Sequence, residues 1–124
     1  MYIKFKEIKD VGDFMKERII FSVEEACDLG QYLIAHSRII SDSVFSSKVQ
    51  NLYWFPDNSV APGDLIVVYT KRGENSVTVN EDDSKTYFFY WGLEQSLSTT
   101  DKNCIVLFNS SWKVIDVPMS PISE

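Results

Sequence analysis

Short apolar segments recur along this chain at intervals of roughly 8 to 15 residues, and turn sequences separate them. Several segments alternate apolar and polar residues as half-buried β-strands do, and no window of about twelve residues keeps a helical period. We expect strands over residues 2–8, 18–23, 31–35, 49–55, 65–69, 77–79, 86–91, 104–108 and 113–117, with a short one near 39–40. This spacing predicts an all-β sandwich or small barrel of about seven to nine short strands.

The composition agrees with that pattern. The 124 residues include 12 Val, 11 Ile and 17 aromatic residues, against 7 Leu and 3 Ala. β-branched and aromatic side chains suit a pleated sheet, whereas Leu and Ala suit helices. The length allows one ordinary domain, and no linker or internal repeat divides the chain. We therefore expect a single sandwich over residues 1–117 and an extended or loose tail over 118–124.

The end of the domain is expected to close with a β-hairpin. Residues 104–108 and 113–117 are both apolar and rich in β-branched side chains, and residues 109–112 form the expected turn between them. The tail that follows contains two prolines, which cannot donate to a strand ladder. The hairpin is therefore expected to be the last regular element.

Charge and targeting features exclude several classes of protein. The net charge is -6 and the isoelectric point is near 4.7, whereas a general nucleic-acid binder needs a basic surface to displace phosphate counterions. We expect no nucleic-acid partner, although an acidic inhibitor of another protein's nucleic-acid site remains an alternative. No stretch approaches the roughly 18 apolar residues of a membrane-spanning helix, and no apolar leader segment begins the chain. We therefore expect a cytoplasmic protein with no membrane partner, in which Cys27 and Cys104 are reduced and buried.

One turn of the chain resembles a known family. Phe-Pro-Asp at residues 55–57 and Ala-Pro-Gly-Asp at 61–64 precede the apolar run Leu-Ile-Val-Val-Tyr, and the whole is similar to the F-P…L-x-P-G turn of lamin tail domains. Residues 17–34 resemble that family's opening motif and residues 104–115 its closing motif, so the resemblance spans roughly residues 17–117. It implies an immunoglobulin-like β-sandwich that works as a binding or attachment module. Because the motifs encode turns and core positions, it implies no reaction.

Few residues could carry catalysis or hold a metal. His36 is the only histidine, so a nucleophile pair with a cysteine or serine would have to use it, yet no catalytic motif surrounds it. We expect His36 to be a surface or edge residue. The acidic loop at residues 80–83 lacks the ligand spacing of a calcium loop, and we expect a solvent-facing hairpin tip. We expect no metal and no other cofactor. The lysines of the first strand are expected to protect a sheet edge rather than bind phosphate.

The aromatic residues carry the most specific indication of function. Residues 52–55 and 87–91 are apolar on both faces of their expected strands. A two-sheet sandwich buries only the inner face of each sheet. One aromatic row in each strand therefore faces outward, unless the long segments at residues 37–47 and 94–103 cover it.

The outward row can be chosen from the turn motif. Phe55 belongs to that motif and is expected in the core, and Tyr53 shares its face. We therefore expect Trp54, together with Phe89 and Trp91, to face outward and form a partner-binding site.

These observations predict a non-catalytic binding or attachment module that engages a protein partner, or associates with itself, through exposed aromatic residues. The alternative is a small-ligand or carbohydrate-binding β-sandwich that uses the same aromatic residues as a stacking platform. A small enzyme built on His36 is a third, less favoured possibility.

Overall fold

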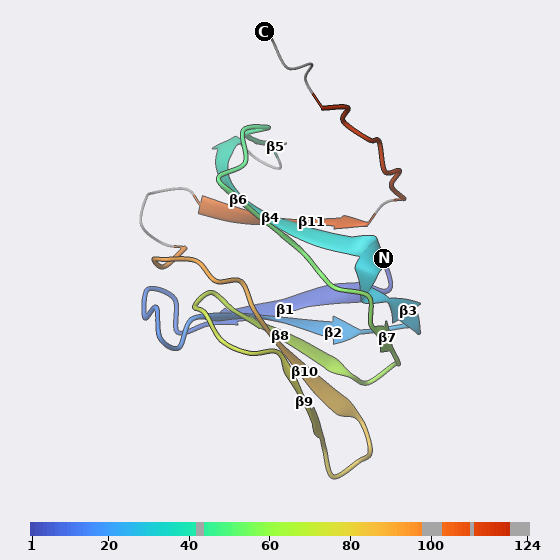
Figure 1. Ribbon diagram of the computed structural model, residues 1–124. Coiled ribbons are helices and arrows are strands. Elements are labelled where there is room, and N and C mark those ends of the chain that lie inside the picture. The colour runs from blue at the N-terminus through green and yellow to red at the C-terminus, as the bar shows by residue number, and fades with distance from the viewer. Residues whose placement is uncertain (42–43, 98–102, 110, 120–124) are drawn as a thin grey trace, which may run out of the picture.

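The computed structural model describes residues 1–41, 44–97, 103–109 and 111–119 (Figure 1). Within these ranges the chain forms eleven strands and one short 3-10 helix, η1. In chain order they are β1 (Ile3–Lys9), β2 (Arg18–Val23), β3 (Cys27–Asp28), η1 (Leu29–Gln31), β4 (Tyr32–Ser41), β5 (Val44–Phe45), β6 (Asn51–Trp54), β7 (Ser59–Val60), β8 (Leu65–Tyr69), β9 (Ser76–Val79), β10 (Lys85–Tyr90) and β11 (Asn103–Asn109). Three of these strands, β3, β5 and β7, have only two residues each, so the eight longer ones match the expected seven to nine.

The strands form two main sheets. One is five-stranded, in the order β1-β2-β8-β10-β9, and β8 and β10 are its only parallel neighbours among the described residues. The smaller sheet is built on β4, which pairs with β11 along one edge and with β6 and β5 along the other. A short β3–β7 ladder lies beside them. Figure 1 shows the two main sheets stacked on each other, and the predicted all-β fold is confirmed.

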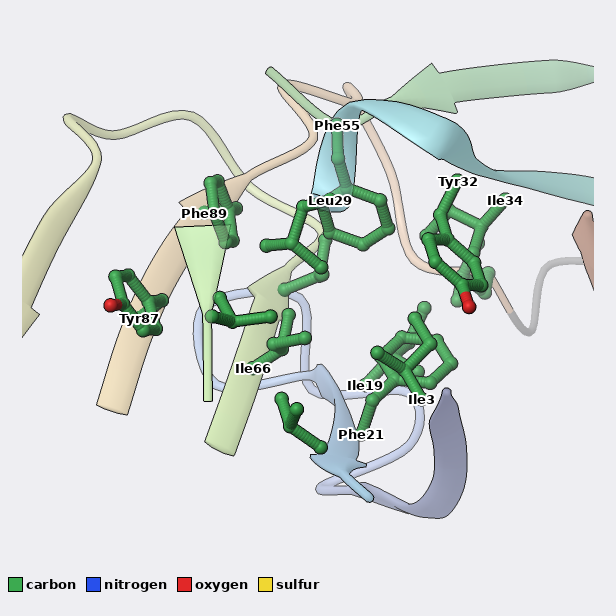
Figure 2. Packing of buried hydrophobic residues seen from close by; sticks show 14 residues of the cluster. Ile3, Ile19, Phe21, Leu29, Tyr32, Ile34, Phe55, Ile66, Tyr87 and Phe89 are labelled. Carbon is green, nitrogen blue, oxygen red and sulfur yellow. The ribbon is translucent and has the colours of Figure 1, made fainter. Parts of the chain in front are cut away.

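The hydrophobic core fills the space between the two sheets (Figure 2). Alternation along β2, β8 and β10 directs one row of each strand inward, and β4 and the residue after β6 supply the opposing side chains. The Phe55 ring lies edge-to-face against Phe21 and Phe89, with ring centroids 6.4 and 5.3 Å apart. Phe55 therefore links both sheets, as its place in the turn motif predicted.

The turn before β8 is formed by side-chain and backbone hydrogen bonds. Gly63 has φ +90, a conformation that other residues adopt only with strain. The Asp64 carboxylate accepts from the Ala61 N–H at 2.9 Å and from the Lys85 N–H at 2.9 Å. The aspartate thus closes the turn and ties it to the start of β10.

The expected closing hairpin is not formed, and this prediction is wrong. Residues 113–117 make no strand, and three of their apolar side chains are 72–89% exposed. The Trp112 ring instead lies edge-to-face on Trp54, with centroids 5.3 Å apart. Trp54 belongs to β6, on the opposite side of β4 from β11. The chain therefore crosses the smaller sheet rather than returning along β11.

Three other expectations have mixed outcomes. The segment 37–47 was expected to be mostly loop, but β4 continues through Ser41 and pairs with β5; residues 42–43 lie outside the described residues. β1 is an edge strand, as its lysines predicted. Of the expected tail 118–124, residues 118 and 119 are described and form no regular structure, whereas 120–124 lie outside the described residues.

No helix in the described part of the chain is both long enough and apolar enough to cross a membrane.

Candidate functional site

The structure separates the three aromatic residues that were predicted to face outward together. Trp54 is 48% exposed, as expected. Phe89 is only 3% exposed and belongs to the core, so its predicted place in a binding site is wrong. Trp91 is partly buried and packs against the same core, 6.1 Å from the Tyr53 ring, so it does not join Trp54 on an open surface either.

The prediction failed because it assigned the wrong face of β10 to the solvent. Tyr87 and Phe89 point to the core, so alternation directs Phe88 and Tyr90 to the other face. There the Tyr90 ring stacks on Tyr69, with centroids 5.3 Å apart and planes 10° apart. The parallel pairing of β8 with β10 sets these two tyrosines side by side. No local pattern in the sequence predicts that pairing.

The outer face of the smaller sheet is apolar. The inner row of β4 contains Tyr32 and Ile34, so Leu33, Ala35 and Ile39 point outward. The neighbouring strands contribute outward side chains by their register, and these are Leu52 and Trp54 from β6 and Cys104, Val106 and Phe108 from β11. This row offers few polar groups to water.

The chain covers part of this face itself. The Phe45 ring of β5 lies edge-to-face on Phe108 with centroids 6.4 Å apart, and the Ser37 hydroxyl donates to the Ser46 carbonyl at 2.6 Å. The hairpin that contains β5 therefore folds over one end of the face, as one reading of the segment 37–47 allowed. The segment 94–103 does not take that role in its described part, because Leu97 is buried in the core; residues 98–102 lie outside the described residues.

The other end of the face is open and holds the Trp54–Trp112 pair. The Trp54 indole donates from Nε1 to the Gly30 carbonyl at 2.8 Å, which fixes the ring on the sheet. A Cβ at Gly30 would collide with the Asp57 carboxylate, so a larger residue here would displace the Asp57 side chain. The 3-10 turn therefore positions the exposed tryptophan.

Exposed apolar side chains are concentrated on this side of the molecule. The described residues include 19 exposed large hydrophobic side chains, and 12 of them come from residues 39–54 or 112–119. We call the outer side of the smaller sheet the Trp54 face and define it by the exposed Phe45, Leu52, Trp54 and Trp112 and the partly buried Phe108. An exposed apolar surface on a small domain is typical of an interaction site.

His36 is buried rather than exposed, so the prediction of a surface or edge residue is wrong. It is 3% exposed and belongs to the inner row of β4. Its Nε2 lies 2.9 Å from the Asn103 Oδ1 and its Nδ1 lies 3.4 Å from the Asn51 Nδ2. An amide oxygen accepts and an amide nitrogen donates, so in this pattern Nε2 donates to Asn103 and Nδ1 accepts from Asn51.

The hydrogen bonds of His36 leave neither ring nitrogen free to take a proton from a nucleophile. Cys104 lies opposite Ser37 in the ladder, and alternation places both on the outer face while His36 faces inward. Two hollows of about 260 and 480 Å³ adjoin His36 at this end of the sandwich. Cys104 also lines the smaller hollow, but the His36 ring nitrogens bond to Asn103 and Asn51 rather than to that thiol. The arrangement therefore favours a structural histidine.

The lining of the smaller hollow includes a buried carboxylate that sequence reasoning missed. Glu17 is fully buried, and its Oε2 accepts from the Gly12 N–H at 2.9 Å and from the Ser96 hydroxyl at 2.6 Å. Its Oε1 accepts from the Leu97 N–H at 2.9 Å. Burial raises the pKa of this carboxyl, but these hydrogen bonds outweigh burial and bring the pKa below its ordinary value.

The Thr70 hydroxyl also lowers the pKa of Glu17, although no hydrogen bond of standard geometry joins the two groups. The carboxylate thus accepts hydrogen bonds from the loops on both sides of it rather than binding a ligand in an open cavity. Glu17 lies in a polar stretch before a strand, and nothing in its local sequence distinguishes it from the other acidic residues.

The other candidate groups are engaged in local structure. The acidic loop is a hairpin tip in which Asp82 accepts from the N–H and hydroxyl of Ser84, and these bonds lower the pKa of Asp82. Within the described residues no group of three or more acidic, histidine or cysteine side chains could hold a metal ion. Cys27 and Cys104 are free and only partly buried, and burial raises the pKa of both thiols.

Comparison with known proteins adds no relative. No family model matches the chain, and no curated protein sequence matches it.

Proposed function

We propose that this chain is a non-catalytic binding module that engages another protein through the Trp54 face. The observation that carries the proposal is the concentration of exposed apolar side chains on this face and the adjoining chain segments. Trp54 and Trp112 offer large exposed rings, and tryptophan is among the residue types that most often dominate the binding energy of protein interfaces. The Nε1–Gly30 hydrogen bond holds Trp54 in place before binding, which reduces the entropy lost on association.

A ligand- or carbohydrate-stacking platform is less well supported than a protein interface. Stacking on a sugar uses an open aromatic ring face, whereas the Trp54 and Trp112 planes meet at 78° and each ring's edge or face is used by the other. The hollows at the His36 end are separate from this pair. A thermal-shift screen with sugars and metabolites tests the alternative, because a ligand in large excess over its Kd stabilises the fold by a few kcal/mol.

Kinship with lamin tail domains and a cytoplasmic location belong to the same proposal. The Pro62–Gly63 turn, with Gly63 at φ +90, leads into β8 at the place that the family motif implies. The missing final strand at residues 113–117 departs from the motif. The lack of a catalytic motif around His36 and the pairing of both its ring nitrogens support a non-catalytic role in this proposal.

Site-specific photo-cross-linking tests the interaction face. A photoreactive phenylalanine analogue at position 54 is compared with the same analogue at position 5, in cells that express the protein. Phe5 is a matched control because it is 50% exposed, lies on the five-stranded sheet and makes an edge-to-face contact of its own with Phe21. We expect a discrete protein adduct from position 54 alone. Equal adducts from both positions, or none from position 54, would contradict the proposal.

A further inference from the structure

We propose that β9 is the docking edge for the C-terminal segment of a second copy of this chain, residues 113–117, which adds to the five-stranded sheet as a sixth strand. This inference concerns a surface other than the Trp54 face and names the partner that occupies it. It is built from an open sheet edge and an unpaired strand-like segment in the same molecule.

The outer edge of β9 carries free backbone groups. β9 is the last strand of its sheet, all four of its residues are exposed, and among the described residues no strand pairs with its other side. The Asn80 N–H donates to the Ser84 carbonyl at 2.7 Å, so these two residues form a hydrogen-bonded pair. The ladder alternates from there, so Thr78 bonds to β10 while Val77 and Val79 direct their N–H and C=O groups outward.

This edge lacks the features by which proteins block strand addition. The opposite edge strand, β1, has a bulge between Phe5 and Glu7 and three lysines. The residues of β11 are partly buried from Asn103 to Phe108. β9 has the sequence Ser-Val-Thr-Val, with no proline, no lysine and no register shift against β10. Of the two edges of the five-stranded sheet, β9 is therefore the one better prepared to accept another strand.

The segment 113–117 has the composition of a strand but no partner. Val114, Ile115 and Val117 are 72, 78 and 89% exposed, and the segment forms no regular structure. Figure 1 shows this segment and β9 at opposite ends of the molecule, so a chain cannot pair its own segment with its own β9. The segment must therefore come from a second copy.

An antiparallel register that sets Ile115 opposite Val79 pairs apolar side chains with each other and brings opposite charges together. It places Val117 opposite Val77 and brings Lys113 close to the turn after β9 of the other copy, which carries Glu81 and Asp82. Cross-strand β-branched pairs and opposite charges both stabilise such a ladder.

In this register the added side chains extend an existing apolar surface. Val77 lies opposite Tyr87 in the β9–β10 ladder, so the two share the inner face of the sheet. A hollow of about 500 Å³ lies there, and its lining combines Val77, Tyr87 and Phe89 with polar residues that include Asn58, Asn75 and Lys85. Ile115 and Val117 of the second copy point to the same face and cover this hollow.

The position of Pro118, which follows the segment, is compatible with the same register. Residues 115 and 117 direct their backbone groups to Val79 and Val77, so the even-numbered residues face away from β9. Pro118, which has no N–H to donate, therefore stands at a position that needs none.

Charge disfavours the simpler pairing of β9 with β9 of another copy. A two-fold antiparallel pair centred on Thr78 would bring the acidic residues that flank β9 in one copy close to those of the other, because the segment from residue 74 to residue 83 has four acidic residues and no basic one. Like charges opposite each other destabilise a ladder. A reciprocal exchange of C-terminal segments closes a two-fold dimer instead, and a one-way exchange builds an open chain.

Size-exclusion chromatography with light scattering on the full chain tests the proposal. We expect the wild type to exceed its monomer mass of 14.3 kDa as concentration rises. Ile115→Pro should weaken association about tenfold or more, because it removes a bonding N–H. Asp116→Pro, its matched control in the same exposed segment, should not. A wild type that stays monomeric at millimolar concentration, or equal effects of the two prolines, would overturn the proposal.

Two further variants separate this interface from the Trp54 face. Val79→Pro removes an outward N–H from β9 and leaves the bonds to β10 intact, so it should dissociate the oligomer without unfolding the chain, as circular dichroism would verify. Trp54→Ala should leave the oligomer in place. The opposite result, dissociation by Trp54→Ala and not by Val79→Pro, would overturn the β9 proposal and assign self-association to the Trp54 face.

Disulfide trapping tests the register. In a background with Cys27 and Cys104 replaced by Ala, Thr78→Cys with Asp116→Cys places two thiols at a non-hydrogen-bonded pair, whose Cα separation suits a disulfide. We expect covalent oligomers under mild oxidation. Thr78→Cys with Val114→Cys, shifted by two residues, is the control and should give at most about a tenth of that yield. Equal yields from both pairs would contradict the register.

Discussion

The Glu17 carboxylate accepts a hydrogen bond from the Leu97 N–H at 2.9 Å, and thereby joins two loops that lie 80 residues apart in the sequence. Glu17 immediately precedes β2, and Leu97 follows β10 and packs in the core. Both are buried. The carboxylate therefore fixes one end of the sandwich through a charged group that water does not reach.

Glu17→Gln should lower the free energy of unfolding by about 2 to 3 kcal/mol. The carboxylate accepts from three donors, whereas an amide replaces one oxygen with a donor that faces the N–H of Leu97 or of Gly12. A buried donor without a partner costs roughly that much. Urea denaturation measures the effect. Glu24→Gln, at an exposed position, is the control and should change stability by less than about 0.5 kcal/mol.

The effect of Glu17→Gln should depend on pH. The pKa of Glu17 is lowered in the folded chain, so the ionised carboxylate contributes stability above its ordinary pKa of 4.5. That contribution is lost as pH falls through the lower, folded-state pKa. The difference in unfolding free energy between wild type and Glu17→Gln should therefore be constant from pH 7 to about 5 and shrink below 4.5. Denaturation curves at several pH values test this, and a difference that grows on acidification would contradict it.

Trp54 and Trp112 should be energetically coupled. Their edge-to-face contact at 5.3 Å predicts a coupling energy of about 0.5 to 1 kcal/mol in a double-mutant cycle with alanine. The same cycle between Trp112 and Phe5, which belongs to the five-stranded sheet, should give none. Absence of coupling in the first cycle would mean that Trp112 does not rest on the sheet in solution.

Cys27 and Cys104 should react slowly with iodoacetamide. Burial raises the pKa of both thiols, and the neighbouring Asp28 carboxylate adds to this at Cys27. The reactive thiolate is therefore scarcer at pH 7.5 than in an unstructured peptide. Mass spectrometry of timed reactions should show alkylation slower than that of a free cysteine peptide, and the two rates should converge in 8 M urea. A rate equal to the peptide's in the folded chain would contradict the raised pKa values.

Local pattern was sufficient for most of the longer strands and for the turn before β8. Residues 65–69 are predicted and observed as a strand, and the aromatic residues 86–91 coincide with β10 within one residue at each end. Alternation and turn chemistry act between neighbours in the chain, so each of these segments carries its own information. The same reasoning placed Trp54 correctly at an exposed position, because Phe55 of the turn motif is a core residue.

Which side of a strand faces the core depends on contacts with residues that are distant in the sequence. Phe89 and Phe88 are neighbours of equal hydrophobicity, and only the packing of Phe55 and Tyr53 against β10 makes Phe89 the buried one. His36 is buried because Asn51 and Asn103, on two other strands, satisfy both of its nitrogens.

The sequence by itself thus determined an all-β chain, the places of most strands and the presence of more aromatic side chains than one core needs. Only the tertiary structure decided where that surplus lies, on the Trp54 face of the smaller sheet, and that residues 113–117 find no partner within their own molecule. The physical reason is that strand formation follows from short-range alternation, whereas burial and pairing depend on contacts between residues that are distant in the chain.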